Sequence, residues 1–192
     1  MSDSSRNDTA KIHQIYSTLE SNTSQALTNL TDLAEGGSEE SMIVLGGIYC
    51  AGRHVKKDLE RGKYWYRRAV EKGSSRAAYI LGRHYLALHQ FSEARENFEI
   101  SAGKGFVPGM SFLGRMYGTG EGGDRDLLKA ENLLGSAYRA GNLMAKAMFG
   151  RFLILNGSGL WRRVRGLWLF ISAIIEVFII SLREGTSSPR LY

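Results

Sequence analysis

Cysteine and proline are scarce in this chain. Among its 192 residues there is one cysteine, Cys50, and there are two prolines, Pro108 and Pro189. A single cysteine excludes an intramolecular disulfide and is typical of a protein in a reducing compartment. So few prolines permit long, uninterrupted helices. The chain is therefore not expected to be a small disulfide-stabilised secreted domain, and its apolar residues must supply the core.

The amino terminus lacks the apolar stretch of a secretion signal. Residues 1–9 are mostly polar, and we expect them to form a short disordered tail. This predicts a cytoplasmic protein. The net charge is +6, but basic and acidic residues are mixed through most of the chain. A nucleic-acid-binding surface would need a basic patch or stripe, so no nucleic-acid partner is expected.

What the chain does have is a motif that recurs at a fixed spacing. The motif Leu-Gly-x-x-Tyr begins at Leu45, Leu81 and Leu113, and a weaker copy begins at Phe149. The glycines of successive copies are 36, 32 and 36 residues apart. A period in the thirties predicts a stacked array of helical hairpins. Arrays of this kind usually bind partners and seldom catalyse reactions.

A small residue follows in the same rhythm, at Ala26, Gly62, Ala94, Ala130 and Gly166. Bulky residues lie three and four positions after most of these, on one side of a predicted helix. Each unit is thus expected to consist of a helix A, a short loop and a helix B. The 32-residue unit is four residues shorter, and we place the loss in the loop around residues 86–90.

The ends of helix B carry recognisable capping residues. Asp58 and Asp126 stand just before helix B, where a carboxylate can accept hydrogen bonds from free backbone N–H groups. A glycine comes eleven residues after the first four small residues and suits the left-handed residue that ends a helix. These glycines are Gly37, Gly73, Gly105 and Gly141.

The segment Val55-x-x-Asp58-x-x-x-Gly62-x-x-Trp65-Tyr66-x-x-Ala69-x-x-x-Gly73 resembles the second half of a Sel1-like repeat, a branch of the tetratricopeptide-like superfamily. Residues 107–141 are nearly as similar. The resemblance implies an all-α, right-handed α-solenoid of helical-hairpin repeats that binds proteins or peptides on its concave side. It also implies a non-catalytic protein, without a cofactor or a small-molecule substrate.

These observations divide the chain into segments. A disordered tail, 1–9, precedes a degenerate repeat at 10–37. Sel1-like repeats then cover 38–157, and a hydrophobic helix covers 160–184 before a second tail, 185–192. The repeats are predicted at 38–73, 74–105, 106–141 and, in part, 142–157.

The hydrophobic segment has three reasonable fates. It could be the last helix B, because Gly166 falls in that register, but it would then leave a large apolar surface exposed. It could attach the protein to the cytoplasmic face of a membrane, either by spanning the bilayer or by lying flat on it, with the arginines of residues 161–165 at the headgroups. It could also dock on another protein, where Glu176 would meet a cationic partner. The candidate residues are Arg162, Arg163, Arg165, Trp168, Phe170, Ile174, Glu176 and Phe178.

A second candidate surface is a column of arginines. Arg83, Arg115 and Arg151 each follow the glycine of the repeated motif, and His84 is next to the first of them. The family resemblance places helix A on the concave side, so this column could contact an acidic peptide. No metal site is expected, because none of the four histidines is spaced for shared metal ligation. The sequence therefore predicts a protein-interaction adaptor with a membrane-associated partner; the alternative is a soluble scaffold whose last helix is buried in a complex.

Overall fold

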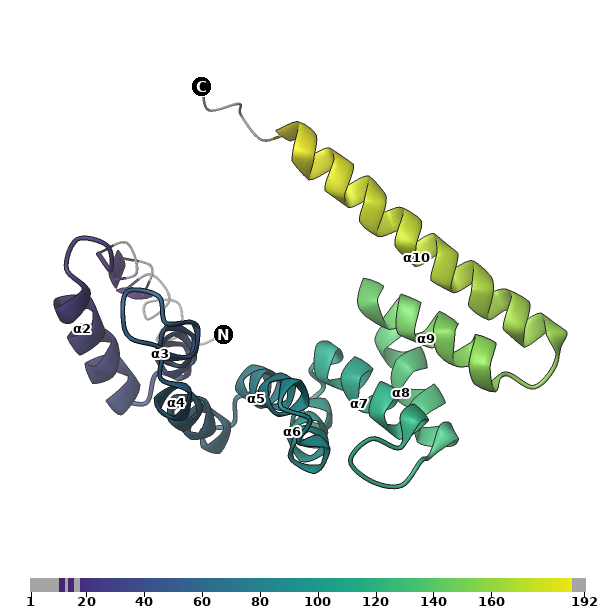
Figure 1. Cartoon of the computed structure of the whole chain (residues 1–192), viewed down its shortest axis with the longest axis horizontal. Coiled ribbons are helices and arrows are strands. Elements are labelled where there is room, and N and C mark those ends of the chain that lie inside the picture. The colour runs from purple at the N-terminus through teal and green to yellow at the C-terminus, as the bar shows by residue number, and fades with distance from the viewer. Residues whose placement is uncertain (1–10, 13, 16–17, 188–192) are drawn as a thin grey trace. The chain divides into compact units, whose positions relative to one another are not determined.

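The computed structural model describes residues 11–12, 14–15 and 18–187, with side chains as far as Arg183. Regular structure in this part of the chain is entirely helical (Figure 1). The chain forms two compact units, residues 1–87 and 88–192. The predicted tail 1–9 lies outside the described residues, as do the last five residues of the predicted tail 185–192.

The first unit contains four described helices. They are α2 (Thr23–Glu35), α3 (Glu39–Ala51), α4 (Leu59–Glu71) and α5 (Ser75–Ala87). The small helix-B residues Ala26 and Gly62 are both buried. Leu30, Met42 and Leu45 are completely buried, and Trp65 and Tyr66 of α4 complete this core.

The second unit contains five helices. They are α6 (Phe91–Gly103), α7 (Val107–Thr119), α8 (Leu127–Arg139), α9 (Leu143–Asn156) and α10 (Leu160–Ser187). A core cluster joins α8, α9 and α10 through Leu134, Phe149, Phe152, Leu153 and Leu169. The first half of α10 therefore belongs to the folded repeat array.

The helix ends confirm the predicted capping residues. A side-chain oxygen of Asp58 accepts a 2.9 Å hydrogen bond from the backbone N–H of Arg61, and Asp126 accepts one of the same length from Lys129. The Lys129 N–H holds the pKa of Asp126 below its usual value. The four predicted terminal glycines have φ values between 76° and 103°, in the left-handed region that favours glycine.

The two helices of a hairpin cross at small residues. A Cβ on Gly62 would lie 2.3 Å from the Cys50 sulfur and 2.9 Å from the Gly46 carbonyl oxygen. At the equivalent crossing of α9 and α10, a Cβ on Gly166 would lie 2.7 Å from the Gly150 carbonyl oxygen. Contacts this short exclude larger side chains. The recurring small residues thus mark the points where the backbones of the two helices approach most closely.

The loop lengths explain the one irregular spacing in the sequence. Residues 52–58 join α3 to α4, and residues 120–126 join α7 to α8. Only residues 88–90 join α5 to α6, which is four residues fewer. The deletion is confirmed at the predicted position, and it leaves the flanking helices at 13 residues each.

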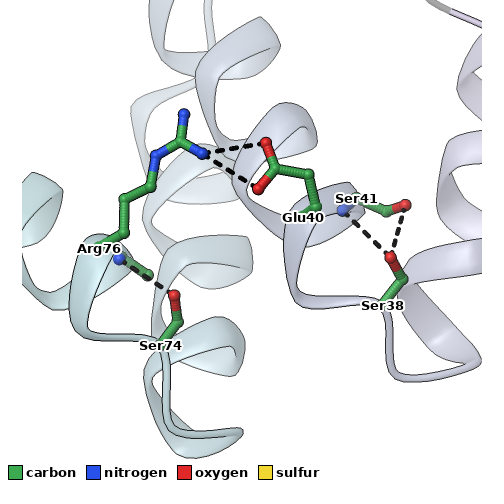
Figure 2. Close-up of polar contacts among 6 residues, drawn as sticks. Ser38, Glu40, Ser41, Ser74 and Arg76 are labelled. Atoms are coloured by element: carbon green, nitrogen blue, oxygen red, sulfur yellow. Dashed lines mark hydrogen bonds and ion pairs between the residues drawn. The ribbon is translucent and has the colours of Figure 1, made fainter. Parts of the chain in front are cut away.

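An ion pair connects two helix-A elements of the first unit. Both carboxylate oxygens of Glu40 in α3 lie 3.1 Å from one guanidinium nitrogen of Arg76 in α5 (Figure 2). Ser38 and Ser74 accept hydrogen bonds from the backbone N–H groups of Ser41 and Ala77, which begin the same two helices. The pair therefore bridges two capped helix starts that are 36 residues apart.

Replacing Arg76 by glutamine is expected to lower the free energy of unfolding by about 0.5 kcal/mol, because exposed ion pairs contribute little. The Arg76 and Glu40 side chains are 55% and 38% exposed, so salt should screen the pair. Urea unfolding at low and high salt measures both effects. Arg83→Gln, at another exposed arginine of α5, is the control. A loss that is equal at both salt concentrations would contradict the electrostatic explanation.

Candidate functional site: the exposed face of the last helix

The first half of α10 packs on α9 along one narrow stripe. We call Arg162, Gly166, Leu169, Ala173 and Glu176 the inner stripe. They are spaced by four and three residues, as on one side of a helix. Leu169 and Ala173 are 1% and 2% exposed. In Figure 1, α10 lies along α9 and continues beyond it.

Both ends of the inner stripe are held by ion pairs. The Glu176 carboxylate pairs with the ammonium group of Lys146 in α9, and Arg162 pairs with Glu131 in α8. The Lys146 ammonium also lies 5.9 Å from the ring centre of Trp168. Glu176 thus has a cationic partner within its own chain. The sequence alone suggested only an external one, since nothing local connects residues 30 positions apart.

The basic cluster before the apolar run is partly engaged as well. Arg163 donates a 3.2 Å hydrogen bond to the Gly157 carbonyl oxygen, while Arg162 pairs with Glu131. Arg165 is exposed. These contacts hold the start of α10 against the loop that precedes it and against α8. Much of the cluster therefore has a structural partner inside the second unit.

The opposite side of α10 is apolar and open to solvent. We call this face the outer stripe: Trp161, Val164, Trp168, Ile171, Ile175, Phe178 and Leu182. Each of these side chains is between 46% and 84% exposed. Nine residues, or two and a half helical turns, separate Gly166 from Ile175 and Leu169 from Phe178. The outer stripe therefore lies diametrically across the helix from the inner one.

The remaining predicted residues of α10 lie beside these two stripes. Phe170 is half-buried, and Ile174 is 54% exposed. Together with Leu160 and Leu167, which are 74% and 51% exposed, Ile174 widens the apolar face. Exposed apolar surface of this extent is typical of a site that interacts with a protein or a membrane.

The predicted arginine column is not uniform. Arg83 in α5 and Arg151 in α9 are exposed, and the Arg83 guanidinium lies 5.9 Å from the Tyr79 ring centre. Arg115 in α7 forms a 2.7 Å ion pair with Glu121, and both side chains are 30% exposed. Arg83 belongs to the first unit, whereas Arg115 and Arg151 belong to the second. Glu121, in the loop after α7, was not singled out from the sequence.

His84 is half-buried in the first unit, with its ring centre 5.8 Å from that of Tyr66. Burial lowers the pKa of the imidazole, and the nearby charges of Lys63 and Arg83 lower it further. In the unfolded chain the group has its ordinary pKa, about 6.5. As the pH falls through that value, the unfolded chain takes up the proton first, so the folded state loses stability.

Between pH 7.5 and 5.5 the thermal midpoint is therefore expected to fall, and His84→Gln should reduce that fall. The thermal midpoint falls with pH because the folded state binds the His84 proton more weakly than the unfolded chain does. Thermal unfolding followed by circular dichroism at both pH values measures the difference. His54, a loop residue between α3 and α4, provides the control variant His54→Gln. Identical pH dependence in wild type and His84→Gln would contradict this assignment.

The repeated tyrosine lies in a hollow in each unit. Tyr49 lines one of about 900 Å³ with residues 55–61, and the Arg61 guanidinium lies 4.3 Å from its ring centre. Tyr117 lines a second hollow, of about 350 Å³. The Arg95 guanidinium lies 4.1 Å from the centre of the Tyr117 ring, and the Lys129 ammonium lies 5.1 Å from it. Cation–π contacts of this kind orient the ring and place positive charge beside it. These cationic neighbours lie outside the repeated motif, so its spacing does not identify them.

Comparison with known proteins agrees with this architecture. The family model described as "Sel1 repeat" matches residues 39–74 and 107–142. No curated protein matches the chain. The described residues also hold no group of three His, Cys, Asp or Glu side chains arranged to share a metal ion.

Two solved structures are similar to the chain. One is a Sel1 repeat protein from Oxalobacter formigenes, with 27% identity and a TM-score of 0.59, which covers 65% of this chain and 97% of that one. The other is a protective antigen of uropathogenic Escherichia coli with an SLR fold, with 25% identity and a TM-score of 0.71. That match covers 86% of this chain and 38% of the antigen. Together with the hairpins and their capping residues, these similarities show that the chain contains two Sel1 repeats and has the fold of Sel1-like repeat proteins.

Proposed function

We propose that this protein is a non-catalytic adaptor. Its repeats form a scaffold for a protein partner, and the outer stripe of α10 is its main attachment surface. Sel1 repeat proteins are generally scaffolds for protein–protein interaction, and the fold is typically not catalytic. The proposal assigns the binding to a particular surface of this chain.

The observation that carries the proposal is the exposure of the outer stripe. The last helix of a repeat array normally presents a polar face to water, which keeps the array soluble. Here Trp168, Ile175 and Phe178 are 64%, 51% and 62% exposed, although Leu169 and Ala173 on the other side of the same helix are buried. A surface of this kind lowers its free energy when a partner covers it.

The packing of α10 favours lateral docking over a membrane crossing. From Arg163 to Glu176 the helix is bound to the rest of the second unit, through Gly157, Gly150 and Lys146. Within α10, eleven residues, 177–187, follow Glu176. At 1.5 Å per residue they extend about 16 Å, against about 30 Å for a hydrocarbon core. A spanning α10 would have to separate from α9, which supports docking on a protein.

A second candidate is attachment to the cytoplasmic face of a membrane, with α10 lying in the plane of the headgroups. By length and composition, the helix at Leu160–Arg183 is long and apolar enough to cross a membrane, and the same apolar residues suit a bilayer surface. Arg165 and Trp161 would suit the interface region of the membrane. This arrangement keeps α9 and α10 together, since only the outer stripe enters the lipid.

The repeat surface supplies the remaining contacts in this proposal. Arg83 and Arg151 are exposed and could pair with an acidic peptide, and His84 is beside the first of them. Arg115 would first have to leave Glu121, so it is the weakest member of the column. Any such contact is expected to weaken as the salt concentration rises.

The test compares three versions of the full chain, because removing α10 would also uncover α9. They are the wild type, the double variant Ile171→Glu/Ile175→Glu in the outer stripe, and the control Val177→Glu. Val177 is 56% exposed but points about 160° away from Ile175 around the helix. Each version is used to isolate bound proteins from the native cell, and each is floated with vesicles of anionic phospholipid.

Proteins retained by the wild type and Val177→Glu, but lost from the double variant, would support a protein-docking face. Flotation that depends on the outer stripe, in the same pattern, would support the membrane alternative. Equal retention and equal flotation by all three versions would exclude α10 as the attachment surface, and with it the proposed function.

A further inference from the structure

We propose that the outer stripe of α10 binds the outer stripe of a second copy of this chain, so that two chains dimerise through antiparallel α10 helices. The inference rests on the proposed function, because it names the partner that covers the attachment surface. It makes the adaptor bivalent, with two sets of repeats held on one helical pair.

The spacing of the outer stripe is that of a helix-pairing surface. Its residues follow one another at 3, 4, 3, 4, 3 and 4 positions, from Trp161 to Leu182. This alternation, kept over three heptads, places apolar side chains along one seam where they can interdigitate with a second helix. No charged residue interrupts the seam. An interfacial membrane helix needs a broad apolar face but no such regular alternation.

The same array already packs a following helix against an apolar side of each earlier helix B. Tyr66 of α4 contacts His84 of α5, Phe98 of α6 stacks on Phe112 of α7, and Tyr138 of α8 contacts Phe149 of α9. In these helices the contacting residues come four or eight positions after the small residue of the crossing. In α10 these positions are Phe170 and Ile174, at the edge of the outer stripe.

A helix is therefore the occupant that this surface is built to receive. In the three earlier hairpins the following helix A fills the position. On α10 the equivalent Ile174 remains 54% exposed, whereas Phe170 is half-buried. A second α10 offers an apolar helix of the same length and the same spacing, and needs no other partner to supply it.

The available area is sufficient for a stable dimer. The seven side chains of the outer stripe, with Leu160, Leu167 and Ile174, are each about half exposed or more. Together they offer on the order of 1,000 Å² of accessible surface per copy, whereas a standard stable interface buries roughly 800 Å² on each partner. Pairing two outer stripes would thus bury a standard interface without any rearrangement of the repeats.

Charge selects the antiparallel orientation. A parallel pair would bring Arg162, Arg163 and Arg165 of both copies to the same end of the interface, where like charges repel. An antiparallel pair places these two clusters at opposite ends. It also aligns six of the seven residues of the outer stripe, with Val164 opposite Leu182, Trp168 opposite Phe178, and Ile171 opposite Ile175 of the second copy.

The internal contacts of the arginines argue for protein over lipid as the occupant. Arg162 is paired with Glu131, and Arg163 donates to the Gly157 carbonyl oxygen. The pair with Glu131 offsets the charge of Arg162, and the contact with Gly157 restrains the Arg163 side chain, so the cluster is less free to bind anionic headgroups. Apolar pairing with a second copy does not depend on these arginines.

The first experiment measures the mass of the purified full chain in solution without detergent, by sedimentation equilibrium at about 10 µM. The chain has a mass of 21.3 kDa, so the expected species is a dimer of twice that mass. Ile171→Glu/Ile175→Glu should be monomeric. Its affinity for a second copy should be at least ~100-fold lower, because pairing would bury two charges of each chain without partners. Val177→Glu should remain dimeric. Circular dichroism checks that all three versions keep the same helix content.

The second experiment tests the orientation. A tagged Ile171→Cys chain is mixed with an untagged Ile175→Cys chain and oxidised. Antiparallel pairing should give a disulfide between the two different chains, because residues 171 and 175 then face each other. A parallel dimer would instead give tagged–tagged and untagged–untagged products. The wild type has only the buried Cys50, so oxidation of the wild type gives the background level of crosslinking.

Three outcomes would overturn the inference. They are a wild-type monomer in solution, a dimer that survives Ile171→Glu/Ile175→Glu, and a chain that is soluble only with detergent and floats with vesicles through the outer stripe. A monomer that still retains another protein through this face would leave the proposed function intact. If binding to proteins, to vesicles and to a second copy were all independent of the outer stripe, both the proposed function and the dimer would be excluded.

Discussion

Replacing Gly166 by leucine is expected to separate α10 from α9 and to lower the free energy of unfolding by about 3 kcal/mol. The first atom of any side chain at this position would lie 2.7 Å from the Gly150 carbonyl oxygen and 2.9 Å from the Ile154 backbone nitrogen. Both atoms belong to a helix backbone, which cannot rotate away as a side chain does. The helices must therefore move apart, and Leu169 and Ala173 would lose their packing.

Urea unfolding measures the loss of stability, and hydrogen exchange locates it. Amide protection should fall in α9 and α10 but remain in α6 and α7. Gly103→Leu is the matched control, because no atom lies within 4 Å of an added Cβ there. Equal stability of the two variants would show that the close approach of α9 and α10 at Gly150 and Gly166 is not needed for their packing.

Replacing Phe98 by alanine is the second change with a large expected effect, a loss of about 3–5 kcal/mol. Phe98 is fully buried, and its ring is stacked on Phe112 with 5.1 Å between the ring centres. Its removal would leave a cavity between α6 and α7 in addition to the lost apolar burial. Since each repeat is stabilised mainly by its neighbours, the damage should be centred on these two helices.

Chemical denaturation followed by circular dichroism measures this loss. The control is Leu128→Ala in α8, where the side chain is 72% exposed and its removal should change stability by less than about 0.5 kcal/mol. Hydrogen exchange should show faster opening of α6 and α7 in the Phe98 variant. If the two variants were equally stable, the assignment of Phe98 to the core of the second unit would be wrong.

Much of the fold could be predicted because its determinants are local. The helix starts at Asp58 and Asp126 depend on a side chain and a backbone N–H three residues away. The helix ends at Gly73 and Gly141 depend on one left-handed residue. The spacing of the repeated motif located the shortened loop before α6. Each of these features is determined within one helical turn or one repeat, so the sequence displays it directly.

The candidate sites were less predictable, because their contacts connect distant residues. Arg115 had the same place in its repeat as Arg83 and Arg151, yet Glu121 neutralises it in the loop after α7. Glu176 seemed to need an external partner until Lys146 was found beside it. Such pairs depend on where helices cross and on the reach of long side chains, and no spacing rule contains that information.

The last helix shows both parts of this division. Its start, its apolar character and its place in the helix-B register were determined by the sequence alone, because they follow from residue type and period, although the helix continues three residues beyond the predicted end at 184. Which side would be buried was decided only by the tertiary structure. The close crossing of Gly150 and Gly166 and the ion pairs of Glu176 and Arg162 orient the inner stripe toward α9 and α8. The outer stripe is exposed as a consequence, since a rigid helix that buries one face must present the opposite one.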